Sequence, residues 1–176
     1  MANIPTIETE RLILRPHKLE DFKDCAAMWA DPVVTRHIGG IPSTEQQAWA
    51  RMTSYLGHWS LMGFGYWALE EKASGRYIGE LGFADFKRAL EPSIAGIPEL
   101  GWALASSAHG RGFATEAIQA AAAWGDARFD RTVCLINPAN LASIRVAQKC
   151  GYRRFRETTY KGEAVFLFER TGAVPK

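Results

Sequence analysis

Cysteine is scarce in this chain and forms no recognisable motif. The three cysteines, Cys25, Cys134 and Cys150, are widely spaced, and no two of them form a Cys-x-x-Cys pair. The four histidines are scattered, and no His-Glu-x-x-His pair occurs. These absences argue against a disulfide framework and give no metal-site motif. We therefore expect no bound metal, and we expect Cys25 and Cys134, which lie in apolar runs, to be buried thiols in a reducing compartment.

Long apolar runs are also missing. No stretch of about 18 apolar residues is found, which argues against a membrane span. The opening residues MANIPTIETERL have neither the basic start nor the apolar core of a signal peptide. We expect a cytoplasmic protein that makes no membrane contact.

No charge of one sign dominates the chain. The formal net charge is +2 and the sequence pI is about 8.5. A nucleic-acid binder usually gathers basic residues on one face. Arg153, Arg154 and Arg156 form the one dense basic cluster, and an exposed strand face explains it better than an RNA contact. We expect no nucleic-acid partner.

The remaining composition is that of a globular protein. The chain has 176 residues, of which 47% are hydrophobic and 23% charged. This length supports one domain with a substantial core. No repeat, linker or low-complexity segment divides it.

Hydrophobic periodicity predicts an alternation of strands and helices. A helix over 43–62 begins with a Ser-x-x-Gln capping box at Ser43, and Pro32 ends the helix before it. The helix over 112–129 places Phe113, Ala117, Ile118, Ala121 and Trp124 on one face. The predicted strands are 10–15, 66–71, 77–86, 99–105, 132–136, 152–160 and 164–170, and the predicted helices are 19–31, 43–62, 112–129 and 142–150.

This order of elements predicts one α/β domain. The strand, helix and strand over 99–136 require a parallel crossover, whereas the earlier strands are expected to be antiparallel. The fold class is therefore a single mixed, mostly antiparallel sheet that is flanked by helices.

Two glycines bracket an arginine at the start of the helix over 112–129, in the stretch SSAHGRGFATEA. The amides at a helix N-terminus lack partners and attract anions such as phosphate. A P-loop would need Gly-Lys-Ser/Thr, and a dinucleotide fingerprint would need glycine at position 115, where threonine stands. A phosphate cradle and an ordinary glycine turn both remain open at this point.

A second polar cluster follows the next strand, in INPANLASIRVAQKCGY. Asn137 ends the strand over 132–136, on the edge of the sheet where ligands of such sheets bind. Asn140 and Ser143 stand at the start of the following helix. Helix capping explains both of them, and Asn140 can cap the helix and contact a ligand as well.

Together these two stretches resemble the GNAT acyl-CoA N-acyltransferases. The forms GRGFATEA and N-x-x-S-I-R-V-x-x-K-x-G-Y, with the opening ETERLILRP, resemble the RimJ/RimL-like branch, which includes ribosomal-protein N-terminal acetyltransferases. The resemblance covers about residues 8–170, which we take as the domain. It implies a GNAT fold with a splayed central parallel strand pair and acetyl-CoA as co-substrate.

The resemblance also implies a set of cofactor contacts. The pantetheine arm of acetyl-CoA would lie between the splayed strands, bonded to backbone near Trp102 and Leu104. Asn140 would contact that arm, Ser143 would lie near the thioester sulfur, and Asn137 would stand beside them. The backbone amides that would hold the pyrophosphate belong to His109, Gly110, Arg111, Gly112, Phe113, Ala114 and Thr115.

Amine attack on a thioester needs a base and benefits from an acid. Glu99, at the head of the strand over 99–105, is the candidate general base, with Asp85 and Glu116 as alternatives. Many relatives carry a tyrosine acid where this chain has Ala147, which leaves Ser143 as the candidate acid. The loop opens with His109 where relatives carry other residues. A backbone amide near Leu104 is the candidate oxyanion donor.

The acceptor amine is least determined by the sequence. The segment 31–65 is expected to form one wall of its pocket, although its aromatic side chains are more typical of core. A protein N-terminal α-amine is the leading acceptor, and a polyamine, amino acid or aminoglycoside is the alternative. A non-catalytic CoA-binding module, a nucleotide-binding module and a homodimer stay open.

Overall fold

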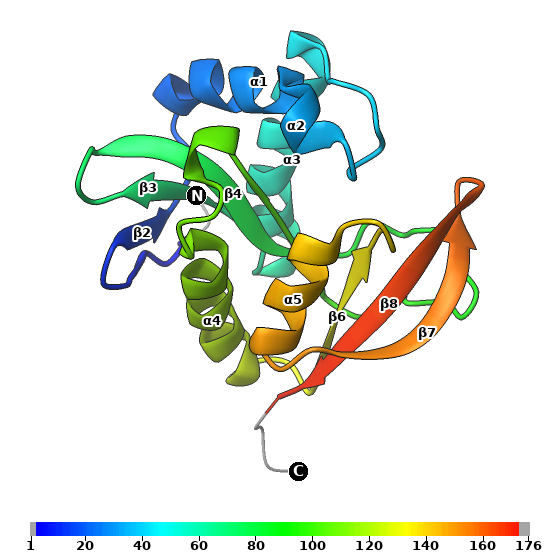
Figure 1. Ribbon diagram of the computed structural model, residues 1–176. Helices are drawn as coiled ribbons and strands as arrows, with labels where there is room; N and C mark the ends of the chain where they lie inside the picture. Colours follow the sequence, from blue (N-terminus) through cyan, green and yellow to red (C-terminus); the bar gives the residue numbers. More distant parts are fainter. Residues whose placement is uncertain (1–2, 173–176) are drawn as a thin grey trace.

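The protein is built on one eight-stranded sheet (Figure 1). The computed structural model describes residues 3–172. The strands lie in the order β1-β2-β3-β4-β5-β6-β8-β7. All neighbours are antiparallel except β5 and β6. The strands are β1 (Ile7–Glu8), β2 (Leu12–Arg15), β3 (Tyr66–Glu71), β4 (Arg76–Ala84), β5 (Glu99–Leu104), β6 (Arg131–Ile136), β7 (Arg153–Tyr160) and β8 (Glu163–Thr171).

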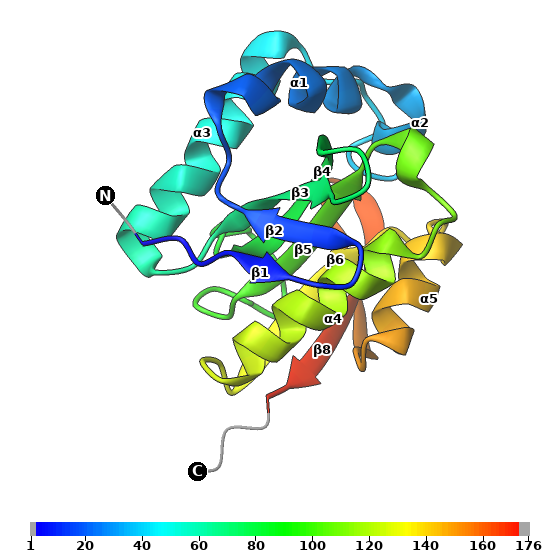
Figure 2. The same ribbon diagram turned by 90° about the vertical axis from the view of Figure 1, so that its left-hand side faces the viewer.

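Helices cover both faces of the sheet (Figures 1 and 2). The first three lie over one face, and the last two lie side by side over the other. Among residues 3–172, no helix has the length and apolarity needed to cross a membrane. The helices are α1 (Phe22–Ala30), α2 (Pro32–Thr35), α3 (Glu45–Met62), α4 (Phe113–Asp126) and α5 (Leu141–Lys149).

The apolar face predicted for α4 packs onto the sheet. Phe113, Ala117, Ile118 and Ala121 are buried, and Trp124 packs against the same core cluster. This burial fixes the start of α4 close to the end of β5. The strand-helix-strand prediction is also confirmed, because β5 and β6 are parallel.

Three local features differ from the sequence prediction. The capping box of α3 is formed by Thr44 and Gln47, one residue later than expected. Pro32 begins the short helix α2 instead of only ending α1, because Asp31 caps the amide of Val33 and proline suits the first turn of a helix. The two-residue strand β1 was not predicted.

The three cysteines are buried and free, as expected for Cys25 and Cys134. The basic cluster lies on the edge strand β7, where Arg153, Arg154 and Arg156 are exposed. It therefore forms an exposed strand face, as the sequence favoured.

Candidate active site

The central parallel pair opens along most of its length. The two strands are paired only at Glu99 and Val133, where the Val133 amide donates to the Pro98 carbonyl at 3.0 Å. The Ala105 amide donates to Ile78 on the other side of β5. Because backbone groups alternate along a strand, the amides and carbonyls of Trp102 and Leu104 point toward β6, past the last paired residue. An extended ligand can pair with this free edge.

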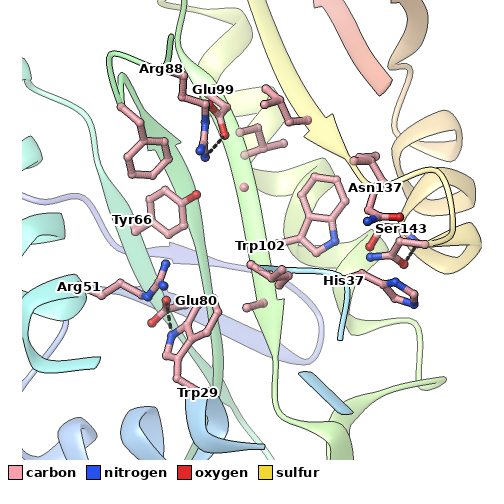
Figure 3. A pocket seen from close by; sticks show the side chains of 18 of the residues that line it. Trp29, His37, Arg51, Tyr66, Glu80, Arg88, Glu99, Trp102, Asn137 and Ser143 are labelled. Atoms are coloured by element: carbon pink, nitrogen blue, oxygen red, sulfur yellow. Dashed lines mark hydrogen bonds and ion pairs between the residues drawn. The ribbon is translucent and has the colours of Figure 1, made fainter. Parts of the chain in front are cut away.

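A cavity of about 160 Å³ lies on this opening (Figure 3). Its walls come from both layers of helices and from the central strands. It is lined by Trp29, His37, Ile38, Arg51, Tyr55, Tyr66, Glu80, Phe86, Arg88, Glu99, Leu100, Gly101, Trp102, Ala103, Leu135, Ile136, Asn137, Asn140 and Ser143.

One wall of the cavity is the start of α5. Asn140 caps this helix, and its side-chain oxygen accepts from the Ser143 amide at 3.1 Å. Asn137 accepts from the Ala139 amide at 2.9 Å and so shapes the turn between β6 and α5. These bonds hold all three side chains beside the open strand edge.

A buried ion pair lies in the opposite wall. Glu99 is 5% exposed, and Arg88 donates to its two carboxylate oxygens at 2.7 and 2.8 Å. Burial opposes the charge of Arg88, but the hydrogen bonds and charge of Glu99 raise the pKa of the guanidinium. This two-point contact fixes the carboxylate at the cavity surface while each oxygen retains a free lone pair.

A second carboxylate, Glu80 on β4, is fully buried. It accepts from Trp29 Nε1 at 2.9 Å and from the hydroxyls of Tyr55 and Tyr77 at 2.6 and 2.9 Å. His17 Nε2 lies 3.6 Å from it. Burial pushes the pKa of Glu80 upward, but His17 and the hydrogen bonds from Tyr55 and Tyr77 outweigh it and leave the pKa below its usual value.

The glycine loop adopts a conformation suited to an anion. Gly110 and Gly112 have φ of 71° and 81°, which favours glycine over residues with side chains. The first backbone bond of α4 joins the Glu116 amide to the Gly112 carbonyl at 3.2 Å. The amides of Phe113, Ala114 and Thr115 therefore have no partner inside the helix.

The side chains of this loop contact other residues and not the free amides at the start of α4. His109 Nε2 lies 2.9 Å from the Leu104 carbonyl, and Arg111 forms an ion pair with Glu71. Arg11, which the sequence analysis did not single out, donates to the Arg111 carbonyl at 2.9 Å. Its guanidinium and that of Arg111 both stack on the Phe113 ring. The loop thus offers backbone amides flanked by two partly paired cations.

The cavity brings together Glu99, Trp102, Asn137, Asn140 and Ser143. Leu104 and the residues His109–Thr115 do not line it, and they continue from the far end of β5 toward α4. The two alternative bases are engaged elsewhere. Asp85 binds Lys87 and the Gly96 amide, and Glu116 binds Thr9 and Arg11.

The expected wall from segment 31–65 is present in part. His37, Arg51 and Tyr55 line the cavity, together with Trp29 and Tyr66 just outside that segment. The aromatic side chains of Trp59 and Trp67 instead belong to the core. Arg51, Glu80 and Arg88 were missed, although a charged residue inside the otherwise apolar run YIGELGF could have identified Glu80.

A second cavity, of about 350 Å³, lies beside α1 and the turn between β3 and β4. It contains the carboxylates of Asp24, Asp31 and Glu71. Ser106 and Val33 donate hydrogen bonds that keep the pKa of Asp31 low, and those of Ser74 and Arg111 do the same for Glu71. Arg76 and Arg111 also line this cavity, but three carboxylates against two guanidinium groups leave no excess of positive charge for a pyrophosphate.

Known proteins share both the sequence and this fold. Residues 11–153 match the family model described as an acetyltransferase (GNAT) domain. An N-acetyltransferase of Bacillus licheniformis, p20, is 28% identical over 152 residues, which are 85% of this chain and 83% of that protein. A chain of Bordetella pertussis, named as a GNAT-family acetyltransferase, has a TM-score of 0.83, is 35% identical and covers 96% of this chain and 100% of its own.

A more distant structure shares the fold alone. It is RimL, named as a ribosomal L7/L12 alpha-N-protein acetyltransferase in complex with coenzyme A. Its TM-score is 0.76 at 16% identity, and the match covers 96% of this chain and 98% of RimL. The family model spans most of the chain, so this protein belongs to the GNAT acetyltransferases and is an N-acetyltransferase of that family.

Proposed function

We propose that this protein transfers the acetyl group of acetyl-CoA directly to a primary amine, the α-amine of a protein N-terminus. The observation that carries the proposal is the free edge of β5. It runs from unpaired amides at the start of α4 to a cavity that contains Glu99. We assign this activity to one domain over residues 8–170, in the RimJ/RimL-like branch.

The described residues fit acetyl-CoA at two points. The amides of Phe113, Ala114 and Thr115, at the positive end of a 14-residue helix, suit a pyrophosphate. The outward Trp102 carbonyl and Leu104 amide suit the amides of a pantetheine arm, with Asn140 and Ser143 across the opening. The Leu104 carbonyl is occupied by His109 Nε2 at 2.9 Å. Acetyl-CoA supplies a thioester there.

Replacement of Gly112 by valine tests the pyrophosphate site. A Cβ on Gly112 would meet only Arg11, at 3.4 Å, but φ of 81° disfavours any β-branched residue. The strained loop should turn its amides away, and acetyl-CoA affinity should fall at least about tenfold, a loss of about 1.4 kcal/mol. Titration calorimetry measures the affinity, and circular dichroism checks the fold.

Gly162 provides a matched control, since it also has positive φ, 83°, with open space around it. It lies in the turn between β7 and β8, away from the loop. Gly162→Val should carry similar strain and retain full affinity. Unchanged acetyl-CoA affinity in Gly112→Val would mean that the anion site lies elsewhere.

The chemistry requires an uncharged amine. A terminal α-amine has a pKa of about 7.7–8.0 and needs little help at neutral pH, whereas a lysine side chain has a pKa of about 10.4. Glu99, held by Arg88, accepts the ammonium proton directly or through water. Leu104 lies outside the cavity, so the outward amide of Trp102 donates to the acyl oxygen instead. As the C–N bond forms and the C–S bond breaks, Ser143 passes a proton to the departing sulfur and regains one from water.

Replacement of Ser143 by alanine tests the acid. A thiol has a pKa of about 8.5, so its thiolate leaves with only modest help. Turnover should fall about tenfold, below the usual range for acid–base groups, because water can substitute. Acetyl-CoA affinity should remain, since the Asn140 cap uses the backbone amide of residue 143. If only affinity falls, then Ser143 is a cofactor contact.

The charges of the cavity favour an acceptor with a single amine. Its lining contains two carboxylates, Glu80 and Glu99, and two guanidinium groups, Arg51 and Arg88. A polyamine or aminoglycoside would need an excess of carboxylates, so this balance disfavours a polycation. A small amine with one charge remains the second candidate.

A mass-spectrometric acetylation screen tests the proposal. It should offer acetyl-CoA with peptides, polyamines, amino acids and aminoglycosides. We expect acetylated peptide N-termini and no acetylated lysine side chains. Acetylation of small amines alone would favour the second candidate. If acetyl-CoA binds but no amine reacts, the protein is a CoA-binding module. Stabilisation by ATP or NAD instead of CoA would indicate a nucleotide-binding module.

A further inference from the structure

Arg51 is a cation in the wall of the acceptor cavity, and it has no hydrogen-bonding partner among the residues that the structure describes. It projects from α3, and its guanidinium carbon lies 3.8 Å from the centre of the Trp29 ring. Its Nε is shielded from solvent and has no hydrogen-bond partner. Within residues 3–172, its guanidinium forms no ion pair. Buried donors without a partner are few in proteins. Arg131 Nε, Arg170 Nε and Trp124 Nε1 share this state, but of these side chains only Arg51 lines the cavity.

The surroundings of Arg51 hold it in place without using its donors. Trp29, on which it stacks, is fixed by its bond to Glu80. Glu80 already accepts from four donors, including the Cys25 thiol, besides its contact with His17. Figure 3 shows the guanidinium beside Glu80, across β5 from Ser143. Nε is shielded from solvent, but the Nη groups of Arg51 have no hydrogen-bond partner among the described residues and remain available to a ligand in the cavity.

The other cavity arginine shows the contrast. Arg88 donates to both oxygens of Glu99 and has no comparable free fork. A guanidinium fork matches the two oxygens of a carboxylate, and such charge-assisted bonds are among the stronger ones in proteins. The Arg51 guanidinium lies across β5 from Ser143, so it is on the acceptor side of the cavity.

We propose that Arg51 binds a carboxylate on the acceptor, so that the enzyme selects amines that also carry an acidic group. This inference rests on the proposed acetyl transfer to an amine. The acidic group belongs either to a side chain near a polypeptide N-terminus or to the α-carboxylate of a free amino acid. The two sources present the same chemistry to Arg51 at different distances from the amine.

The experiment compares matched acceptors in pairs. C-terminally amidated peptides that begin Ser-Glu or Glu-Ser are compared with Ser-Gln and Gln-Ser, and free glutamate with glutamine amide. We expect kcat/KM to be about tenfold higher for the acidic member of a pair, mainly through KM. A preference among the peptides indicates a side-chain carboxylate, and one confined to the free amino acid indicates the α-carboxylate.

Arg51→Met tests the residue, because methionine keeps apolar contact with Trp29 and removes the charge. The preference for acidic acceptors should disappear, because kcat/KM should fall much more for the acidic than for the neutral acceptors. Arg128→Met is the matched control, since Arg128 also stacks on a tryptophan, Trp124, at 4.1 Å. It does not line the cavity, so its loss should leave the preference intact.

Calorimetric binding to the CoA-loaded protein separates the two proposals. Arg51-dependent binding of acidic peptides without any acetylation would support the carboxylate site and contradict the proposed activity. Acetylation with equal kcat/KM for both members of each pair would support the activity and overturn the carboxylate site. An equal loss for acidic and neutral acceptors in Arg51→Met would reduce Arg51 to a structural role and also overturn it.

Discussion

Replacing Glu80 by alanine is expected to lower the free energy of unfolding by about 3–5 kcal/mol, because several buried donors lose their acceptor and each unsatisfied one costs about 1–3 kcal/mol. Glu80 is fully buried. Its loss leaves Trp29 Nε1 and the hydroxyls of Tyr55 and Tyr77 without their acceptor. Because domains are stable by only about 5–15 kcal/mol, the variant should unfold at clearly lower urea concentration.

Two further variants give this prediction its controls. Glu163→Ala removes an exposed glutamate from β8 and should change stability by less than about 0.5 kcal/mol. Glu80→Gln keeps the shape of the side chain, and the two tyrosine hydroxyls can rotate to accept from the amide. The decrease in the free energy of unfolding should therefore be smaller than for Glu80→Ala. A Glu80→Ala protein as stable as the wild type would show that the buried network contributes nothing.

Glu80 should also make the protein sensitive to acid. Its folded-state pKa is lowered, so its stabilising contribution is present above the unfolded value of about 4.3. That contribution disappears as the pH falls through the folded pKa. Urea unfolding measured from about pH 5 downward should therefore show a steeper loss of stability in the wild type than in Glu80→Gln. Parallel curves would contradict this assignment.

Replacing Glu99 by glutamine is expected to lower turnover about a hundredfold at low pH, the lower part of the range for general acid–base groups. Glutamine cannot accept the ammonium proton. Raising the pH should partly restore the rate, because the amine then loses its proton to solvent. Turnover across pH, with acetyl-CoA affinity measured separately, gives the comparison.

A stability control is needed because Glu99 also pairs with Arg88. Asp126→Asn breaks another partly buried arginine pair, with Arg170, that does not line the cavity. It should leave the pH profile of turnover unchanged. If Glu99→Gln has a wild-type profile, then Glu99 is a structural partner of Arg88 and the base must be sought elsewhere.

Local patterns predicted most elements because each signal lies within a few residues. The apolar face of α4 and the order of strand, helix and strand were enough to place β5 beside β6. The predictions were wrong where two neighbouring residues, or two roles of one residue, suit the end of a helix about equally well. Ser43 and Thr44 are both good helix caps, and each has a glutamine three residues later, Gln46 or Gln47, so the spacing does not choose between them. The structure uses Thr44 and Gln47. Proline at position 32 suits the start of a helix as well as its end.

The site was only partly predictable for a different reason. Asn140 and Ser143 lie three residues apart in one helix cap, so spacing alone brings them together. Arg88 reaches Glu99 from the loop after β4, and Arg51 reaches the cavity from α3, so their meeting depends on tertiary packing. Glu80 stands among apolar neighbours on β4, and only the fold shows that Trp29, Tyr55 and Tyr77 surround it.

The proposed acetyl-CoA site along β5 and the start of α4 is tested most directly by mapping the backbone amides that acetyl-CoA contacts. Titration of the protein with acetyl-CoA, followed by the backbone amide resonances, reports on each residue. We expect the largest chemical-shift changes at Trp102 and Leu104 on β5 and at Gly112–Thr115 at the start of α4. Shifts confined to the second cavity, around Asp24 and Asp31, would contradict this proposed site.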